Sequence, residues 1–188
     1  MSLNHSKLNK IGSVGQILDC NDVIILDEEI LVKGSNVFQS YYNNKEETDK
    51  VFYNEYFMTG DTGYIDSEYY LYITGRKKEL YKLDNGKYIN PSYIESILLG
   101  SSKIKQIFIY GDNRPYNIAL IVPNENIEIN DIIKDINSYD LKKYEIPQKI
   151  LFVEPFTIEN KLLTPKLSLI RKNIYELYKD KINDLYNN

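Results

Sequence analysis

The sequence of 188 residues contains one cysteine, one histidine and no tryptophan. Because Cys20 has no second cysteine to pair with, an internal disulfide is excluded, and a reducing compartment is the simplest interpretation. His5 lies close to the N-terminus, so neither a Ser/His or Cys/His catalytic pair nor a Cys/His zinc site is expected. Any chemistry of this chain must therefore use other residue types.

Long apolar runs and an excess of positive charge are also absent. No run approaches the roughly 20 apolar residues that a membrane-spanning helix needs, and the first residues, MSLNHSKLNK, lack the apolar core of a signal peptide. The formal net charge is −4, without a broad basic stripe, which argues against a nucleic-acid partner. We therefore expect a cytoplasmic protein that has no transmembrane segment and binds no nucleic acid.

The residues that are present are typical of a folded domain. Hydrophobic residues make up 43% of the chain, a share that excludes a disordered or membranous chain. The 18 tyrosines accompany frequent Asn, Ile and Lys, as an AT-rich genome would impose. We interpret the tyrosines as strand and core-edge residues rather than as a recognition surface.

Residues 78–188 are predicted to form an α+β domain. Asn90 can cap a helix that has Pro91 in its first turn and Gly100 after its end. The apolar spacing predicts, in chain order, a strand at 79–83, that helix, a hairpin of 105–110 with 117–122, a helix at 129–136, a strand at 149–153 and a long final helix. One face of the final helix is expected to carry Ile170, Ile174, Leu177, Tyr178, Ile182 and Leu185.

Residues 1–77 are predicted to be rich in strands and poor in helices. Short strands are expected at 23–26 and 30–33, a hairpin at 63–66 with 70–74, and a short helix in NNKEETDKVF. Because this part has hardly any apolar helical face, we interpret it as a piece of a larger domain, or as a small sheet beside the second domain.

Asp61 and Arg76 are the candidate binding residues with the clearest setting. Each follows a glycine at the expected end of a strand, in YFMTGD and YITGR, and two such ends can meet at one rim. A carboxylate can accept two hydrogen bonds from the cis-diol of a ribose, and a guanidinium fits a ribose oxygen, a phosphate or a carboxylate. Taken singly, each is better explained as an ordinary turn residue or a surface arginine.

A basic cluster surrounds this arginine in an otherwise acidic chain. It consists of Arg76, Lys77, Lys78, Lys82 and Lys87. Phosphate groups would be attracted to it, although clusters of this size are usually solvated turns.

Five motifs occur along the chain in a recognisable order. They are GSVGQIL, EILVKGSNVFQSYYNNKEET, YFMTGDTGYID, LYITGRKKELYKLDNGKYINPSYIE and KLLTPKLSLIRKNI. This order resembles that of the adenylate-forming acyl-CoA synthetases, most of all the long-chain fatty-acid branch, over nearly the whole chain. The resemblance implies that residues 78–188 form the small mobile C-terminal domain. It also implies that residues 1–77 form the strand-rich C-terminal end of the large AMP-binding domain.

The resemblance further implies a two-step ligase reaction and a role for several residues. Enzymes of this family use ATP to activate a carboxylate as an acyl-adenylate, after which the small domain turns and coenzyme A attacks. By position, Asp61 and Arg76 would hold the ribose, Lys78 would be the hinge, and Gly86 with Lys82 would line the coenzyme A channel. Mg²⁺ would arrive with the nucleotide, since no ligands for it are expected in this chain.

The closing motif departs from the family pattern. Aligned on Arg171, it has Ser168 where the family has a lysine that approaches the acyl phosphate. Lys166 would lie on the same face of an extended segment, about 7 Å away, and is the candidate catalytic residue. Lys161 is a weaker candidate.

Most of the large domain has no counterpart in this sequence. Because a phosphate loop and an acyl tunnel are lacking, the isolated chain is not expected to turn over. Three interpretations stay open: the C-terminal portion of a long-chain fatty acid–CoA ligase, a degenerate module that binds a nucleotide or a partner, and an α+β interaction domain related by descent only. In the first, the fatty acid would bind through the large domain. The parent enzyme could then associate peripherally with a membrane, at the cytosolic face of the endoplasmic reticulum.

Overall fold

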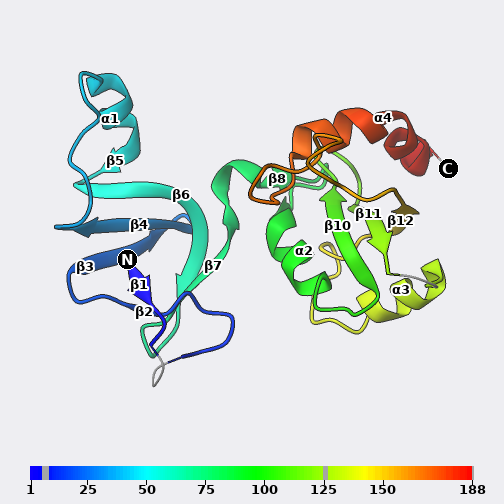
Figure 1. Cartoon of the computed structure of the whole chain (residues 1–188), viewed down its shortest axis with the longest axis horizontal. Helices are drawn as coiled ribbons and strands as arrows, with labels where there is room; N and C mark the ends of the chain where they lie inside the picture. The colour runs from blue at the N-terminus through cyan, green and yellow to red at the C-terminus, as the bar shows by residue number, and fades with distance from the viewer. Residues whose placement is uncertain (6–8, 125–126, 188) are drawn as a thin grey trace. The chain divides into compact units, whose positions relative to one another are not determined.

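The computed structural model describes residues 1–5, 9–124 and 127–187. The chain divides into two compact units, Met1–Glu79 and Leu80–Asn188 (Figure 1). Within the described residues, no helix is both long enough and apolar enough to cross a membrane.

A five-stranded antiparallel sheet forms most of the first unit. Its strand order is β3 (Asn21–Leu26), β4 (Glu29–Gly34), β6 (Tyr56–Ile65) and β5 (Phe52–Tyr53), and β7 (Leu71–Arg76) also pairs with β6. The remaining elements of the unit are β1 (Ser2–Leu3), β2 (Gln16–Ile17), the helix α1 (Lys45–Val51) and the 3-10 turn η1 (Lys77–Glu79).

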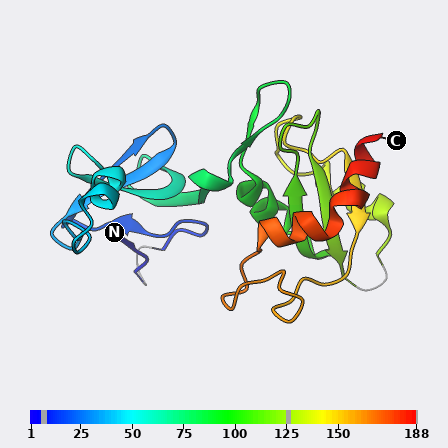
Figure 2. The ribbon, with the colours of Figure 1, turned by 90° about the horizontal axis from the view of Figure 1, so that it is seen from above.

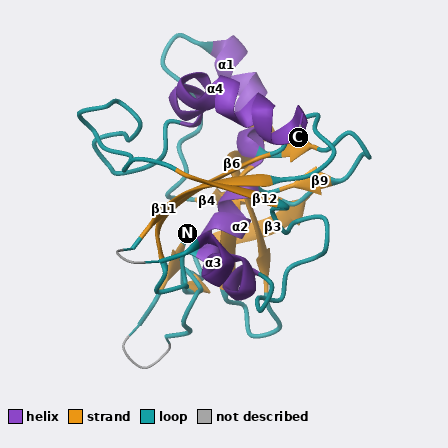
Figure 3. Cartoon of the chain, turned by 90° about the vertical axis from the view of Figure 1, so that its right-hand side faces the viewer, coloured by secondary structure: helices purple, strands orange, loops and turns teal. Residues whose placement is uncertain are grey.

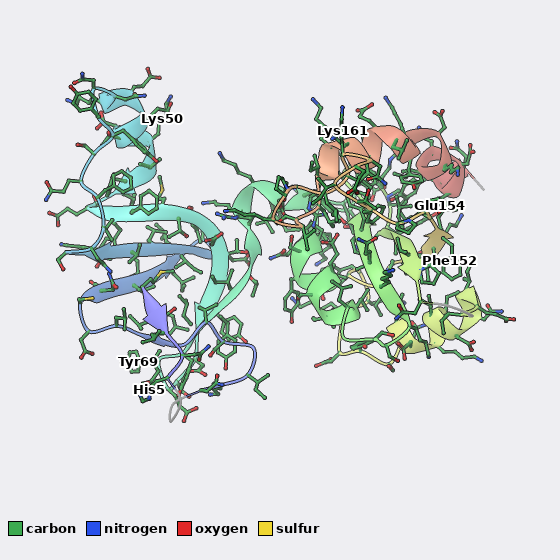
Figure 4. All side chains as sticks on the ribbon, viewed as in Figure 1. His5, Lys50, Tyr69, Phe152, Glu154 and Lys161 are labelled. Carbon is green, nitrogen blue, oxygen red and sulfur yellow. The ribbon has the colours of Figure 1, made fainter. Side chains whose placement is uncertain are left out.

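Two tight turns fix the register of this sheet. Asp27 and Glu28 join β3 to β4 with φ of 49° and 65°, and this geometry gives a two-residue turn that matches the twist of the strands. The turn between β6 and β7 is closed by the carboxylate of Asp66, which accepts two backbone N–H groups, and Figure 4 shows Tyr69 at this turn. Both hairpins expected from the sequence are confirmed, with longer strands than predicted.

A three-stranded sheet between helices forms the second unit. The strands β10 (Ile104–Tyr110) and β11 (Ile118–Pro123) form the expected hairpin, and β12 (Lys149–Phe152) pairs in parallel with β11. Parallel pairing needs a crossover connection, and this one contains α3 (Ile129–Ile136). The other elements are β8 (Tyr81–Lys82), β9 (Tyr88–Ile89), α2 (Pro91–Leu98) and the final helix α4 (Arg171–Asn187).

Alternating side chains of the three-stranded sheet face two separate cores. Ile107 and Ile109 of β10 pack with α2 and α3 on one face, whereas Phe108 packs with α4 on the other. Figures 1 and 3 show α4 on one side of these strands and α2 and α3 on the other, and Figure 2 shows α4 running across them. The layers confirm the α+β class.

The helix α2 begins as the sequence predicts. The side chain of Asn90 accepts the N–H of Tyr93 at 3.2 Å, and Pro91 occupies the first turn, where its missing N–H costs nothing. The chain leaves the helix at Leu99 and Gly100, so the predicted stop is confirmed within two residues.

One expectation about the second unit is confirmed only in part, and another is wrong. The strand predicted at 79–83 is extended only at Tyr81 and Lys82, because η1 ends at Glu79 and a tight loop begins at Leu83. Leu177 of α4 is 62% exposed rather than part of the buried face. Successive helical residues lie about 100° apart, so Leu177 falls outside the stripe that its neighbour Tyr178 shares with the other buried residues of α4.

Candidate functional site

The structure brings Asp61 and Arg76 together on neighbouring strands. They stand directly opposite each other in the β6–β7 pairing. Nη1 of Arg76 lies 2.8 Å from Oδ1 of Asp61 and also donates to the carbonyl of Thr59 at 3.4 Å. The guanidinium side chain is 60% exposed, whereas the carboxylate side chain is 21% exposed. The pair therefore forms a rim that a ligand can approach from solvent.

Gly60 shapes the strand just before Asp61. Its φ of 72° is a conformation that residues with a side chain rarely adopt. The hydroxyl of Thr59 accepts the N–H of Asp61 at 3.1 Å and donates to the carbonyl of Ile30 at 2.7 Å. The Thr-Gly-Asp sequence thus sets the direction of the Asp61 carboxylate through local backbone geometry.

Glu29 is a neighbour of this rim that the sequence analysis missed. It is 5% exposed, its Oε1 accepts the N–H of Gly60 at 2.9 Å, and its Oε2 lies 2.7 Å from Nζ of Lys77. A signal was present in the sequence, since EEILV places an acid directly before an apolar strand. Acidic residues are almost never fully buried unless they are paired.

The electrostatics of the rim favour a ligand that donates hydrogen bonds. Burial raises the pKa of the Asp61 carboxyl above its ordinary value, the charge of Arg76 opposes this rise, and the charge of Glu29 adds to it. The raised pKa means that the ionised carboxylate lacks full stabilisation in the protein alone. Hydroxyl donors such as those of a ribose would supply it, so the residues present fit a nucleoside cis-diol.

The second unit holds a buried ion pair at the start of α4. Arg171 donates from Nη1 to Oε1 of Glu95 at 3.0 Å and from Nη2 to Oε2, and it also reaches Oγ of Ser92. Glu95 accepts the N–H of Ile109 at 2.7 Å. This two-pronged contact ties α4 to α2 and β10, so the position of Arg171 in the closing motif is fixed by the fold.

The segment before α4 is a turn, which corrects one expectation. Leu167 has φ of 62°, its N–H donates to the carbonyl of Thr164, and the N–H of Ser168 donates to the hydroxyl of Thr164. Because 166–168 is not extended, the expectation that Lys166 and Ser168 share one face is wrong. Both residues are exposed. Lys161, labelled in Figure 4, is also exposed and precedes this turn.

The basic cluster is divided between the two units. Lys77 pairs with Glu29, and Lys78 is an exposed residue of η1 in the first unit. In the second unit, Nζ of Lys82 lies 5.5 Å from the centre of the Tyr88 ring. The cluster is therefore not one continuous phosphate-binding patch within either unit.

Gly86 forms the tight turn that links β8 to β9. It has φ of 86°, and its N–H donates to the carbonyl of Leu83 at 2.9 Å. A residue with a side chain would be strained at this φ, so glycine is needed for the turn itself.

No group of three or more His, Cys, Asp or Glu side chains suited to a metal ion occurs among residues 1–5, 9–124 and 127–187.

Comparison with known protein families identifies the family of the second unit. Residues 79–188 match the model of the AMP-binding enzyme C-terminal domain, which is more than half of the chain. The chain belongs to this family. Its relatives are acyl-CoA synthetases and ligases of the adenylate-forming superfamily, so the resemblance inferred from the motifs is confirmed.

Several curated proteins are similar to this chain along most of its length. Fatty acyl-CoA synthetase B of Dictyostelium discoideum is 28% identical, covering 94% of this chain and 32% of that protein. A long-chain-fatty-acid–CoA ligase of Mycobacterium tuberculosis is 30% identical, with 95% and 34% covered. A 2-succinylbenzoate–CoA ligase of Listeria innocua is 34% identical, with 85% and 35% covered. The chain thus spans about a third of the length of the curated relatives it matches.

Solved structures show the same relationship. O-succinylbenzoate coenzyme A synthetase from Bacillus subtilis, in complex with AMP, is similar with a TM-score of 0.71 and 26% identity, covering 87% of this chain and 35% of that one. The adenylation domain of a carboxylate reductase from Mycobacterium chelonae gives a TM-score of 0.74 and 26% identity, covering 94% and 32%. The name of the family and the AMP complex of the Bacillus subtilis structure support binding of ATP or AMP.

Proposed function

We propose that this chain supplies the ribose-binding rim and the C-terminal domain of an adenylate-forming ligase that converts long-chain fatty acids to acyl-CoA. In the first step, the fatty carboxylate attacks the α-phosphate of ATP, which gives acyl-adenylate and releases pyrophosphate. In the second step, the thiol of coenzyme A attacks the acyl carbon, and AMP leaves. The observation that carries the proposal is the Asp61–Arg76 ion pair, which forms between residues that stand opposite each other in the β6–β7 pairing.

The rim residues would bind and orient the nucleotide. Asp61 would accept hydrogen bonds from the two ribose hydroxyls, and these new donors would offset the burial that raises its pKa. Arg76, held by the Asp61 carboxylate and the Thr59 carbonyl, would add a positive charge beside the same sugar. Mg²⁺ would be bound together with the nucleotide phosphates.

The second unit would contribute to the thioester step. Lys78, which precedes this unit, is the proposed hinge residue, and Gly86 with Lys82 is the proposed lining of the coenzyme A channel. A glycine turn beside a lysine suits a narrow passage for a phosphate-bearing chain. The acyl tunnel and the phosphate loop would belong to the large domain of the same ligase.

The long-chain substrate is supported by relatives that carry that name and by the motifs of the long-chain branch. Ligases for 2-succinylbenzoate are similar at comparable identity, so 2-succinylbenzoate is the competing acyl class.

A second candidate function is a nucleotide-binding module without turnover. Ser168 favours it, because a serine at the family's lysine position cannot neutralise charge on the acyl and phosphate oxygens. Under this alternative the Asp61–Arg76 rim would still bind a nucleotide, whereas the adenylation step would not occur.

Grafting tests the proposal. The chain would replace the C-terminal third of a characterised long-chain ligase and, separately, of a 2-succinylbenzoate ligase, with acyl-CoA measured by mass spectrometry. Each graft is compared with its own native host, because the acyl tunnel comes from the host, and we expect the long-chain graft to retain the larger share of its host's activity. Asp61→Ala should lower kcat/KM for ATP by about 10- to 100-fold, the effect of one or two charge-assisted hydrogen bonds.

Asp19→Ala is the matched control, because it removes an exposed acid of the same unit. Equal activity of the Asp61→Ala graft and the unaltered graft would contradict the proposed role of the rim. ATP-dependent pyrophosphate exchange that is undetectable in both hosts, with AMP binding retained, would favour the module without turnover.

A further inference from the structure

Glu29 is a buried carboxylate to which the proposed function assigns no task. It is the first residue of β4, and its side chain is 7% exposed. Both of its oxygens are used, one by the N–H of Gly60 and the other by the ammonium of Lys77. The Lys77 side chain is 46% exposed, and ion pairs that water reaches contribute little to stability, so stability alone does not explain why an acid is buried here.

The two partners of Glu29 flank the Asp61–Arg76 ion pair. Gly60 precedes Asp61 on β6, and Lys77 follows Arg76 directly after β7. Glu29 therefore fixes the backbone on one side of the carboxylate and the side chain next to the guanidinium. Its charge also acts on the Asp61 carboxyl, whose pKa is raised first by burial and further by Glu29.

Other contacts already hold these strands in register. The hydroxyls of Thr62 and Thr74 form a hydrogen bond of 3.1 Å between β6 and β7, in addition to the backbone ladder. The Thr59 hydroxyl holds the N–H of Asp61, but none of these contacts engages the N–H of Gly60, whose φ is 72° and which has the wide conformational freedom of glycine. By accepting the Gly60 N–H, Glu29 removes that freedom at the residue before Asp61.

We propose that Glu29 is a positioning residue. Through Gly60 and Lys77, it holds Asp61 and Arg76 in the arrangement that receives the cis-diol of a nucleotide ribose. The inference rests on the proposed function, which assigns the ribose to that pair. Glu29 touches no substrate and acts only through the two residues beside it.

Hydrogen exchange of the whole chain, followed by NMR, tests the first part of this inference. Glu29→Leu removes both contacts, and Glu29→Gln keeps an amide oxygen for the Gly60 N–H but loses the charge. Glu55→Gln is the matched control, since it removes one negative charge from the exposed ion pair with Lys33 in the same unit. Exchange at Gly60 should rise by about tenfold or more in Glu29→Leu, less in Glu29→Gln and not at all in Glu55→Gln.

An AMP titration of the same variants separates positioning from stability. Glu29→Leu combined with Lys77→Met, which leaves no charge unpaired, should keep the urea midpoint of the first unit close to that of the wild type. It should nevertheless lose the AMP-induced shifts of the Asp61 and Arg76 amides at the AMP concentration that half-saturates the wild type. A merely structural role would instead lower the midpoint and leave the shifts of the folded protein unchanged, which would overturn the proposal.

A double variant keeps the test decisive if Glu29→Leu does not fold. Glu29→Gln combined with Lys77→Met removes the ion pair without leaving a charge unpaired, and it should lose the AMP-induced shift at Arg76. Unchanged Gly60 exchange and unchanged AMP-induced shifts in the variants would refute a positioning role. Absence of AMP-induced shifts in the wild type would contradict the proposed function instead, while Gly60 exchange would still decide whether Glu29 holds the strand.

Discussion

Asp61 is placed where its charge is costly to the folded protein. Its side chain is 21% exposed, its pKa is raised mainly by burial, and its cationic partner Arg76 is mostly exposed. Sites that bind ligands commonly keep such strain, since a group that the fold leaves under-stabilised gains most from a ligand. The raised pKa of Asp61 is thus a physical sign of a binding role.

Replacing Asp61 with asparagine should stabilise the free protein at neutral pH. A carboxyl with a raised pKa in the folded state favours folding below its unfolded value of about 3.8, and this contribution is lost as the pH rises through the folded pKa. The free energy of unfolding of Asp61→Asn should therefore exceed that of the wild type at pH 7, and the difference should vanish below pH 3.8.

Urea unfolding of both proteins across this pH range provides the measurement. The hydrogen bond from Lys10 lowers the pKa of Asp66, so that group makes the protein less stable as the pH falls. Because both proteins contain Asp66, its effect cancels when the free energies of unfolding of the two proteins are subtracted. A variant less stable than the wild type at pH 7, with an unchanged urea dependence, would show that the Asp61 charge is stabilising.

Ser168 should limit adenylation in a grafted enzyme. If it occupies the place of the family's lysine, Ser168→Lys should raise the rate of pyrophosphate exchange by about 10²- to 10³-fold, the usual effect of one well-placed charged group. Lys166→Ala should have little effect, because the turn at 164–167 separates the two positions. Thioester formation from supplied acyl-adenylate should change little in either variant. A steep loss in Lys166→Ala would identify Lys166 as the catalytic lysine.

The helices and hairpins whose ends are marked by turn or cap residues were predictable from the sequence. Asn90 and Pro91 mark the start of α2, and the Asp27–Glu28 turn marks a hairpin, because each boundary rests on local chemistry. The strand at 79–83 was predicted too long, because Tyr81 and Leu83 pack against the core of the second unit although only Tyr81 and Lys82 form a strand. Periodicity alone does not distinguish these cases.

The helix α4 offers a matched pair of substitutions. Ile182 is fully buried against the sheet, whereas Leu177 is 62% exposed. Ile182→Ala should lower the free energy of unfolding of the second unit by about 2–5 kcal/mol, because it leaves a cavity. Leu177→Ala should change it by no more than about 0.5 kcal/mol. Urea unfolding followed by amide signals of the second unit gives both values, and equal losses would contradict the assigned buried face of α4.

At the scale of the molecule, the two units are expected to behave as separate folding bodies. The two cores on the faces of the three-stranded sheet contain only residues of the second unit. Trypsin should cut after Lys78, an exposed residue beside the division at Glu79, and should leave a stable fragment of residues 79–188. Mass spectrometry of a timed digest reads the result. A resistant fragment that spans residues 70–90 would count against a hinge at this point.

The candidate site was only partly predictable at this scale. Asp61 and Arg76 were found because each follows a glycine in an apolar run, a signal that lies within a few residues of sequence. The strand end expected at Asp61 is nevertheless wrong, because β6 continues to Ile65, and only Arg76 ends its strand. Glu29 was missed because its partners, Gly60 and Lys77, lie 31 and 48 residues away and are brought to it only by the sheet. The turn at 164–167 was missed because it depends on the Thr164 hydroxyl and on a positive φ at a leucine.

The central claim is that the Asp61–Arg76 rim binds the ribose hydroxyls of an adenine nucleotide. Its most direct test compares AMP with 2′,3′-dideoxy-AMP in NMR titrations of the whole chain. The account predicts that AMP shifts the amides of Gly60, Asp61 and Arg76 with a Kd of about 1 mM, since a few charge-assisted hydrogen bonds supply about 4 kcal/mol. The dideoxy nucleotide, which lacks only the two hydroxyls, should leave these amides unshifted. Equal shifts with both nucleotides, or none with either, would contradict the account.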